Sequence, residues 1–132
     1  MADRTPGFII GVVEDDQRIL ESLEMLLESA GHVVRLFTSA MALLDSSSLA
    51  EIDCLISDIG LPAMDGFELL RVVHAARPGL PVILITGRPE MLNRLPPAGA
   101  GHYWLFKKPF DGQELLSAIT TALRNADSRT PE

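Results

Sequence analysis

Cysteine is nearly absent from this sequence of 132 residues, in which Cys54 is the only one. One cysteine cannot form a disulfide within the chain, which excludes the disulfide-bonded frameworks of small secreted proteins. No apolar run approaches the roughly 20 residues that cross a bilayer. The start, with Pro6 and Gly7, lacks the apolar core of a secretory signal. We therefore expect a soluble cytoplasmic protein with no membrane partner.

Basic residues are also few, because 11 Lys and Arg oppose 18 Asp and Glu and leave a net charge of −7. Domains that bind nucleic acid usually present a basic patch, so direct binding to nucleic acid is not expected. A chain of this length holds one core. We expect a flexible lead-in at residues 1–7, one domain at 8–126, and a polar tail or the start of a linker at 127–132.

Apolar runs of strand length alternate with helical patterns along the chain. The expected strands cover residues 8–13, 32–37, 54–57, 81–86 and 103–106. The expected helices cover residues 19–30, 39–45 and 65–76, a weak stretch at 88–95, and a closing helix that includes residues 115–123. This alternation predicts an α/β fold, a doubly wound parallel sheet of five strands with helices on both faces.

Acidic residues mark three of the expected helix starts. Asp65 precedes Glu68 by three residues, and Asp111 precedes Glu114 by the same spacing. This spacing is typical of a capping box, in which the two side chains bind backbone N–H groups of the first turn. Asp16 is interpreted as a third helix-start residue.

Chemically active side chains lie at the ends of four of the expected strands. Glu14 and Asp15 follow the first strand, Asp58 follows the third, Thr86 ends the fourth and Lys108 lies at the end of the fifth. The carboxyl ends of parallel strands meet at one edge of the sheet, where ligands bind. Grouped carboxylates repel one another unless a cation is bound, and oxygen ligands alone favour a hard ion such as Mg²⁺. Since a lysine and a hydroxyl can hold phosphoryl oxygens, the set predicts phosphoryl chemistry.

Each of these residues also has an ordinary structural interpretation. The acids could favour a helix N-terminus, Thr86 could complete a strand, and Lys108 could be a solvated charge. Their joint occurrence at successive strand ends favours function. The lysines support this choice, because the chain has nine arginines and only two lysines, both at residues 107–108.

Over about residues 8–124 the sequence resembles the receiver domains of two-component response regulators. The motifs that carry the resemblance are Val13-Glu14-Asp15-Asp16, Asp58-Ile59-Gly60-Leu61-Pro62-Ala63-Met64-Asp65-Gly66, Ile85-Thr86-Gly87 and Lys108-Pro109-Phe110. The resemblance implies a flavodoxin-like fold with strand order 2-1-3-4-5. It also implies a cis peptide bond between Lys108 and Pro109.

The resemblance further assigns roles to individual residues. Asp58 would be the phosphoacceptor, and Thr86 and Lys108 would hold the phosphoryl oxygens. For Mg²⁺, Asp58 and Asp15 would be direct ligands. The backbone carbonyl of Gly60 would be another ligand, and Glu14 would act through water.

Partners and output follow from the same resemblance. The phosphoryl donor would be a sensor histidine kinase or a histidine phosphotransfer protein. The domain would be a signalling phosphoprotein that promotes its own phosphorylation and dephosphorylation, and not an enzyme with a separate substrate. It would act on an unidentified output partner or effector domain. A homodimer would form through the fourth helix, fifth strand and fifth helix of the family, here residues 88–95, 103–106 and the closing helix.

The sequence departs from the family pattern at two places. Leu105 stands three residues before Lys108, where receivers usually carry Tyr or Phe, and Pro96-Pro97 shortens the expected helix at 88–95. We therefore predict that residues 87–101 are locally unstable and that phosphorylation orders them.

Three other classes of protein fit the sequence less well than a receiver. A Mg²⁺-dependent phosphatase with an aspartate nucleophile would carry a second aspartate at the position of Gly60. A flavin-binding module would not place three acids after its first strand. A degenerate receiver acting as an interaction module would lack some of the residues needed for phosphoryl chemistry, whereas this sequence has all of them.

The remaining reactive side chains are given structural roles. Cys54 is expected in the core, and Arg88 is interpreted as an exposed loop charge. The histidines at positions 32, 74 and 102 share no metal-ligand spacing.

Overall fold

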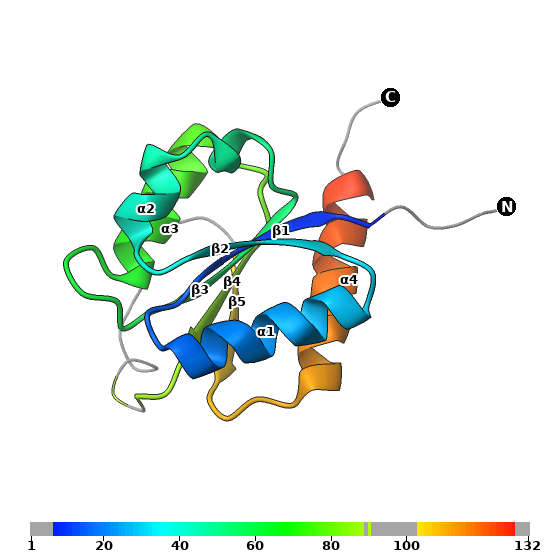
Figure 1. Cartoon of the computed structure of the whole chain (residues 1–132). Helices are drawn as coiled ribbons and strands as arrows, with labels where there is room; N and C mark the ends of the chain where they lie inside the picture. Colours follow the sequence, from blue (N-terminus) through cyan, green and yellow to red (C-terminus); the bar gives the residue numbers. More distant parts are fainter. Residues whose placement is uncertain (1–6, 89, 91–102, 129–132) are drawn as a thin grey trace, which may run out of the picture.

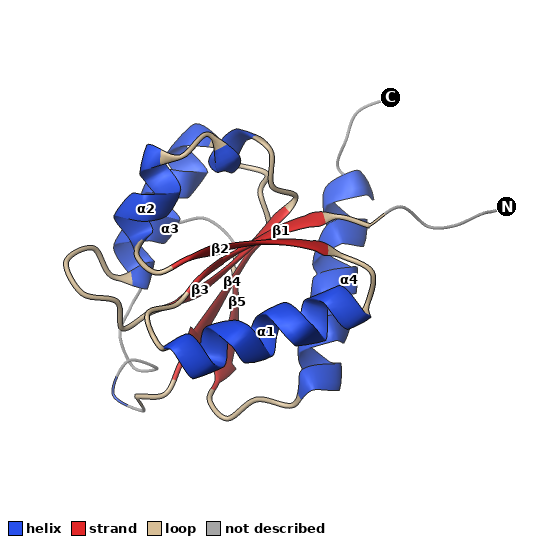
Figure 2. Cartoon of the chain, viewed as in Figure 1, coloured by secondary structure: helices blue, strands red, loops and turns tan. Residues whose placement is uncertain are grey.

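The computed structural model of the chain describes residues 7–88, 90 and 103–128. A parallel sheet of five strands in the order β2-β1-β3-β4-β5 forms its centre (Figure 2). The strands are β1 (Ile9–Val13), β2 (Val33–Phe37), β3 (Cys54–Asp58), β4 (Val82–Thr86) and β5 (Trp104–Lys107). The predicted fold class and strand order are therefore confirmed.

Helices cover both faces of this sheet. They are α1 (Gln17–Ser29), α2 (Ala40–Asp45), α3 (Gly66–Ala76) and α4 (Gly112–Ser128), with a short 3-10 helix at Ser48–Ala50. Figure 1 shows α2 and α3 on one face, and α1 and α4 on the other. Two hydrophobic clusters match these layers, one including Leu43 and Phe67, the other including Leu23 and Ile119.

The burial of each strand follows from its place in the sheet. Every residue of β3 and β4 is buried, as expected for central strands with helices on both faces. The outer strand β5 alternates instead, with Trp104 and Phe106 half-buried and Leu105 and Lys107 exposed. Leu105, at the position where receivers usually carry an aromatic residue, therefore points away from the core.

The predicted helix starts are present. The Asp16 carboxylate accepts hydrogen bonds from the backbone N–H groups of residues 18 and 19 at the start of α1. Asp65 and Glu68 form the complete capping box of α3. The Asp111 carboxylate accepts from the N–H groups of residues 113 and 114. Such caps satisfy N–H groups that have no partner within the helix.

Small differences separate the expected elements from the observed ones. The fifth strand lies one residue later than predicted, and α4 extends to Ser128. Most of the expected helix at 88–95, and most of the segment 87–101 that is predicted to switch by ordering, lie outside the described residues. No helix in the described part of the chain combines the length and the apolar character that crossing a bilayer requires.

Ala63 provides a test of the backbone in the loop between β3 and α3. It adopts a φ of 65°, a left-handed conformation that is unfavourable for a residue with a Cβ atom. We expect Ala63→Gly to raise the free energy of unfolding by about 0.5–1 kcal/mol, because relief of this strain exceeds the entropy that glycine adds to the unfolded chain. Urea denaturation measures the change.

The matched control for Ala63 is a glycine that already has a left-handed backbone. Gly31 has a φ of 92° and no atom within 4 Å of the position that a Cβ would take. Gly31→Ala therefore adds strain without a clash and should lower stability by about 1 kcal/mol. A loss of stability in Ala63→Gly would contradict the assigned backbone conformation.

Candidate functional site

Three carboxylates gather at the carboxyl end of the sheet. Glu14 and Asp15 follow β1, and Asp58 is the last residue of β3. β1 and β3 are neighbours in register, with Val13 opposite Ser57, so the residues that follow them lie side by side. One carboxylate oxygen of each acid lies within 4.8 Å of the others. Figure 1 shows the loops after β1, β3, β4 and β5 at this end of the sheet.

Glu14 is the most buried of the three acids, with 1% of its surface exposed. Burial raises the pKa of its carboxyl above the usual value, and a hydrogen bond from Lys108 partly opposes this rise. Lys108 Nζ donates to Glu14 Oε1 at 2.9 Å, and the backbone N–H of Asp16 donates to Oε2 at 3.1 Å. Both carboxylate oxygens therefore have a donor, as burial of a charge requires.

Lys108 joins two of the acids. Its Nζ lies 2.9 Å from Glu14 Oε1 and 3.5 Å from Asp58 Oδ1. The backbone N–H of Lys108 donates to the carbonyl of Thr86 at 2.7 Å, which holds the end of β5 against β4. The bond from Lys108 to Pro109 is cis, as the sequence resemblance implied. The lysine is thus fixed at its backbone and directed at the carboxylates.

Thr86 ends β4, the strand next to Asp58, and 1% of its surface is exposed. Its Oγ1 accepts a hydrogen bond from the backbone N–H of Arg88 at 3.1 Å. Its contact with the carbonyl of Arg88, at 3.4 Å, is long for an O–H donor. The hydroxyl proton can therefore be donated to a ligand.

The loop after Asp58 folds back tightly against the strand. The backbone N–H of Gly66 donates to the carbonyl of Ile59 at 2.8 Å. A Cβ atom on Gly66 would lie 2.7 Å from the Asp58 carbonyl oxygen and from Ile59 Cα, closer than real contacts allow. The glycine of the Asp65-Gly66 pair is therefore required by this close approach. Gly60, whose carbonyl is a candidate metal ligand, lies within the same loop.

The charges of the cluster favour a cation. Three carboxylates face the single ammonium group of Lys108 and leave two excess negative charges. A hard divalent ion with oxygen ligands would neutralise them. The acidic cluster can therefore hold a metal ion, and its oxygen ligands match the preference of Mg²⁺.

Three other reactive side chains in the described part of the chain lie outside this cluster. Cys54 is fully buried in β3, where burial raises the pKa of its thiol to about 12. The ring of His74 is bonded to the carbonyl of Leu80. His32 accepts from the N–H of Phe8, and burial lowers its pKa. His102 lies outside the described residues.

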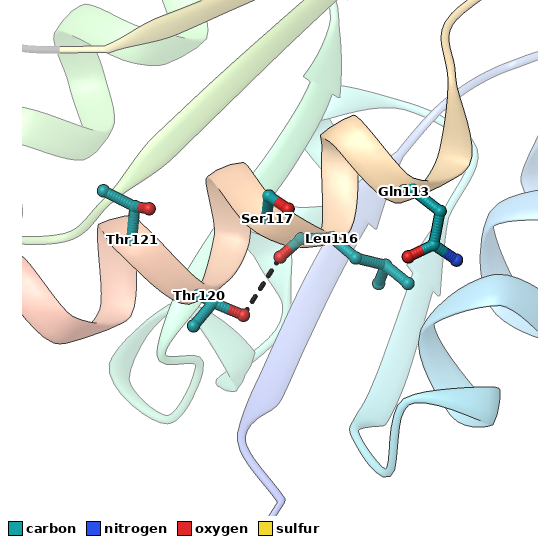
Figure 3. A pocket seen from close by; sticks show the side chains of 5 residues that line it. All are labelled: Gln113, Leu116, Ser117, Thr120 and Thr121. Carbon is teal, nitrogen blue, oxygen red and sulfur yellow. Dashed lines mark hydrogen bonds between the residues drawn. The ribbon is translucent and has the colours of Figure 1, made fainter.

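A separate hollow lies along α4 (Figure 3). It is lined by Gln113, Leu116, Ser117, Thr120 and Thr121. The hydroxyl of Thr120 donates to the carbonyl of Leu116 at 3.0 Å within the helix. None of these side chains carries a charge, so the hollow lacks the groups that phosphoryl chemistry needs.

Sequence reasoning did not anticipate two contacts of the site. The ion pair between Lys108 and Glu14 joins residues 94 positions apart. The side chain of Arg88, which was interpreted as a simple loop charge, lies against Gly60. The one sequence feature that pointed to a role for Arg88 at this site is its position two residues after Thr86, at the end of a strand.

The fold and the site define a doubly wound α/β domain with an acidic cation site beside a lysine. A family model of the response regulator receiver domain matches residues 10–120. Among solved structures, a CheY-like receiver domain from Methanospirillum hungatei superposes with a TM-score of 0.84 at 30% identity, covering 94% of this chain and 99% of that one. The chain belongs to this family and is a receiver domain of a response regulator, a signalling domain of two-component systems.

Curated relatives give the same result. The transcriptional regulatory protein FixJ of Bradyrhizobium diazoefficiens is 34% identical over 123 residues, which cover 93% of this chain and 60% of FixJ. The transcriptional regulatory protein CreB of Escherichia coli is 36% identical over 115 residues, covering 87% of this chain and 50% of CreB. The chain thus spans 50–60% of the length of these two relatives.

Proposed function

We propose that this receiver domain accepts a phosphoryl group on Asp58 from the phosphohistidine of a sensor histidine kinase or a histidine phosphotransfer protein. The observation that supports the proposal most directly is the position of Lys108. Its ammonium lies between the carboxylates of Glu14 and Asp58, at 2.9 and 3.5 Å. It is therefore close enough to both the nucleophile and the metal-binding acids to bind a phosphoryl group between them.

In the proposed reaction an oxygen of the Asp58 carboxylate attacks the phosphorus atom in line. The new P–O bond forms as the P–N bond to the donor histidine breaks, and the electron pair of that bond stays on the imidazole nitrogen. The Lys108 ammonium and the Thr86 hydroxyl donate hydrogen bonds to the phosphoryl oxygens. The backbones of Lys108 and Thr86 hold both donor groups in position before the reaction begins.

Four groups would hold Mg²⁺ in this site. Asp15 and Asp58 would be direct ligands, together with the backbone carbonyl of Gly60, and Glu14 would act through water. When bound, Mg²⁺ supplies positive charge that offsets the negative charge of the transferring group. The burial of Glu14 and its bond to Lys108 are consistent with an indirect role for this acid.

The output is proposed to be a change in conformation that alters partner binding. The relatives include a DNA-binding transcriptional regulator, NtrC, of which this chain covers 26%. By analogy, we propose that the phosphorylated domain controls an effector domain or an output partner in the cytoplasm. A homodimer through β5, α4 and the segment 88–95 remains a prediction, as does ordering of residues 87–101.

Phosphorylation in vitro tests the proposal. The protein is incubated with acetyl phosphate and Mg²⁺, and intact-protein mass spectrometry counts the phosphoryl groups. One acid-labile group is expected, and chelation of Mg²⁺ with EDTA should prevent its addition. A protein that stays unmodified with Mg²⁺, or is modified equally with EDTA, would contradict the proposed function.

A further inference from the structure

Arg88 lies directly beside the loop that follows Asp58. The Nε, Cζ and Cδ atoms of Arg88 lie 3.6, 3.8 and 3.9 Å from the position that a Cβ on Gly60 would take. Gly60 is only two residues after Asp58. Because Gly60 has no side chain, no side-chain atom of residue 60 lies between Arg88 and the backbone of this loop.

The backbone of Arg88 is fixed to the same site. Its N–H donates to the hydroxyl oxygen of Thr86 at 3.1 Å. Thr86 is buried and ends β4, so the hydrogen bond connects Arg88 to the rigid part of the sheet. The side chain therefore starts from a defined point at the rim of the acidic cluster.

The guanidinium of Arg88 is available to a ligand. The side chain is exposed, and among residues 7–88, 90 and 103–128 it has no ion-pair partner. Lys108 differs, because its ammonium is already paired with Glu14 and Asp58. Lys108 would have to break an ion pair with Glu14 or Asp58 to bind an incoming anion, whereas Arg88 has no such ion pair to break within the described residues.

We propose that Arg88 is a second cationic residue of the phosphoryl site and binds the phosphoryl group of the donor from the Gly60 side of Asp58. This inference rests on the proposed function, since it concerns the same reaction. A guanidinium presents several N–H donors in one plane and suits phosphate oxygens. Arg88 forms no bond to the nucleophile in this scheme and assists by attracting and orienting the dianionic donor.

With acetyl phosphate as donor, the step balances without a further reactant. The Asp58 carboxylate oxygen forms a bond to phosphorus, the bond from phosphorus to the acetyl oxygen breaks, and acetate leaves with the electron pair. No proton transfer is required at Asp58. Arg88 keeps its charge throughout and donates N–H groups to the phosphoryl oxygens.

The test compares variants of the full chain in acetyl phosphate and Mg²⁺. Arg88→Gln removes the charge and retains much of the side-chain length. We expect it to lower the second-order rate constant of phosphorylation about fivefold, the upper range for an exposed ion pair. Arg71→Gln, at an exposed position of α3, is the matched control and should leave the rate unchanged.

Mg²⁺ affinity, measured by isothermal titration calorimetry without phosphodonor, separates a charge effect from damage to the site. Arg88→Gln removes a positive charge near the cation and should bind Mg²⁺ as tightly as the wild-type protein or up to about twofold more tightly. A distorted site would instead bind Mg²⁺ more weakly. Arg88→Lys keeps the charge and should recover part of the rate.

The outcomes distinguish this inference from the proposed function. A wild-type protein that accepts no phosphoryl group overturns both. A phosphorylated wild-type protein with an Arg88→Gln rate within twofold of it overturns only the role of Arg88. If Arg88→Gln is slower and also binds Mg²⁺ more weakly, recovery of the rate in Arg88→Lys supports the role, and no recovery contradicts it.

Discussion

A protein with asparagine in place of Asp58 is expected to accept no phosphoryl group from acetyl phosphate. The amide nitrogen and oxygen of asparagine cannot replace the carboxylate as nucleophile, although the side chain has nearly the same shape. Asp58 is 7% exposed at the end of β3, so the substitution also removes one negative charge from a crowded, largely buried cluster. We expect the variant to fold and to be at least as stable as the wild-type protein without Mg²⁺.

The control for Asp58→Asn is the same change at the exposed end of α2. Asp45→Asn alters the net charge equally but lies in another part of the chain. It should be phosphorylated at the wild-type rate. Phosphorylation of folded Asp58→Asn to the wild-type level would show that another residue is the acceptor. Circular dichroism of each variant confirms that a loss is not caused by unfolding.

Substitution of Asp15 by alanine is expected to weaken Mg²⁺ binding by more than about tenfold, because even loss of a second-layer partner typically reduces metal affinity 10- to 100-fold. Asp15 is the exposed member of the acidic cluster, whereas the carboxylate of Glu14 already accepts a hydrogen bond from Lys108. Asp15 is therefore the acid best placed to approach a hydrated ion. The rate of phosphorylation at low Mg²⁺ should fall in parallel.

Thermal unfolding with and without Mg²⁺ measures the effect of Asp15→Ala. Mg²⁺ should raise the Tm of the wild-type protein, because a ligand that binds only the folded state stabilises it. Without Mg²⁺ the variant should be slightly more stable, since one repelling carboxylate has been removed. Asp45→Ala serves as the control and should retain the full Mg²⁺ response. An undiminished Mg²⁺ response in Asp15→Ala would place the metal elsewhere.

The sequence allowed the sheet and its helices to be predicted because each signal is local. Buried parallel strands are nearly continuous apolar runs, and the runs that became β3 and β4 are of this kind. Asp16, Asp65 and Asp111 cap helices through residues two or three positions away. The boundaries were less predictable, and β5 begins at Trp104, one residue later than its apolar run indicates.

The acidic cluster was also predictable, since parallel strands deliver their carboxyl ends to one edge. The contacts between its side chains were not. Lys108 pairs with both Glu14 and Asp58, and this depends on a few ångströms of side-chain placement between residues far apart in sequence. The approach of Arg88 to Gly60 likewise depends on the path of two loops, for which the sequence carries no periodic signal.

Chemical trapping of the phosphorylated residue tests the central claim most directly. The protein is treated with acetyl phosphate and Mg²⁺, and borohydride then reduces any aspartyl phosphate to homoserine, which peptide mass spectrometry locates. Homoserine is expected at position 58 alone, and only when Mg²⁺ is present. Homoserine at Asp15 or at another aspartate, or its absence at position 58 in a folded protein, would contradict the assignment of Asp58 as the phosphoacceptor.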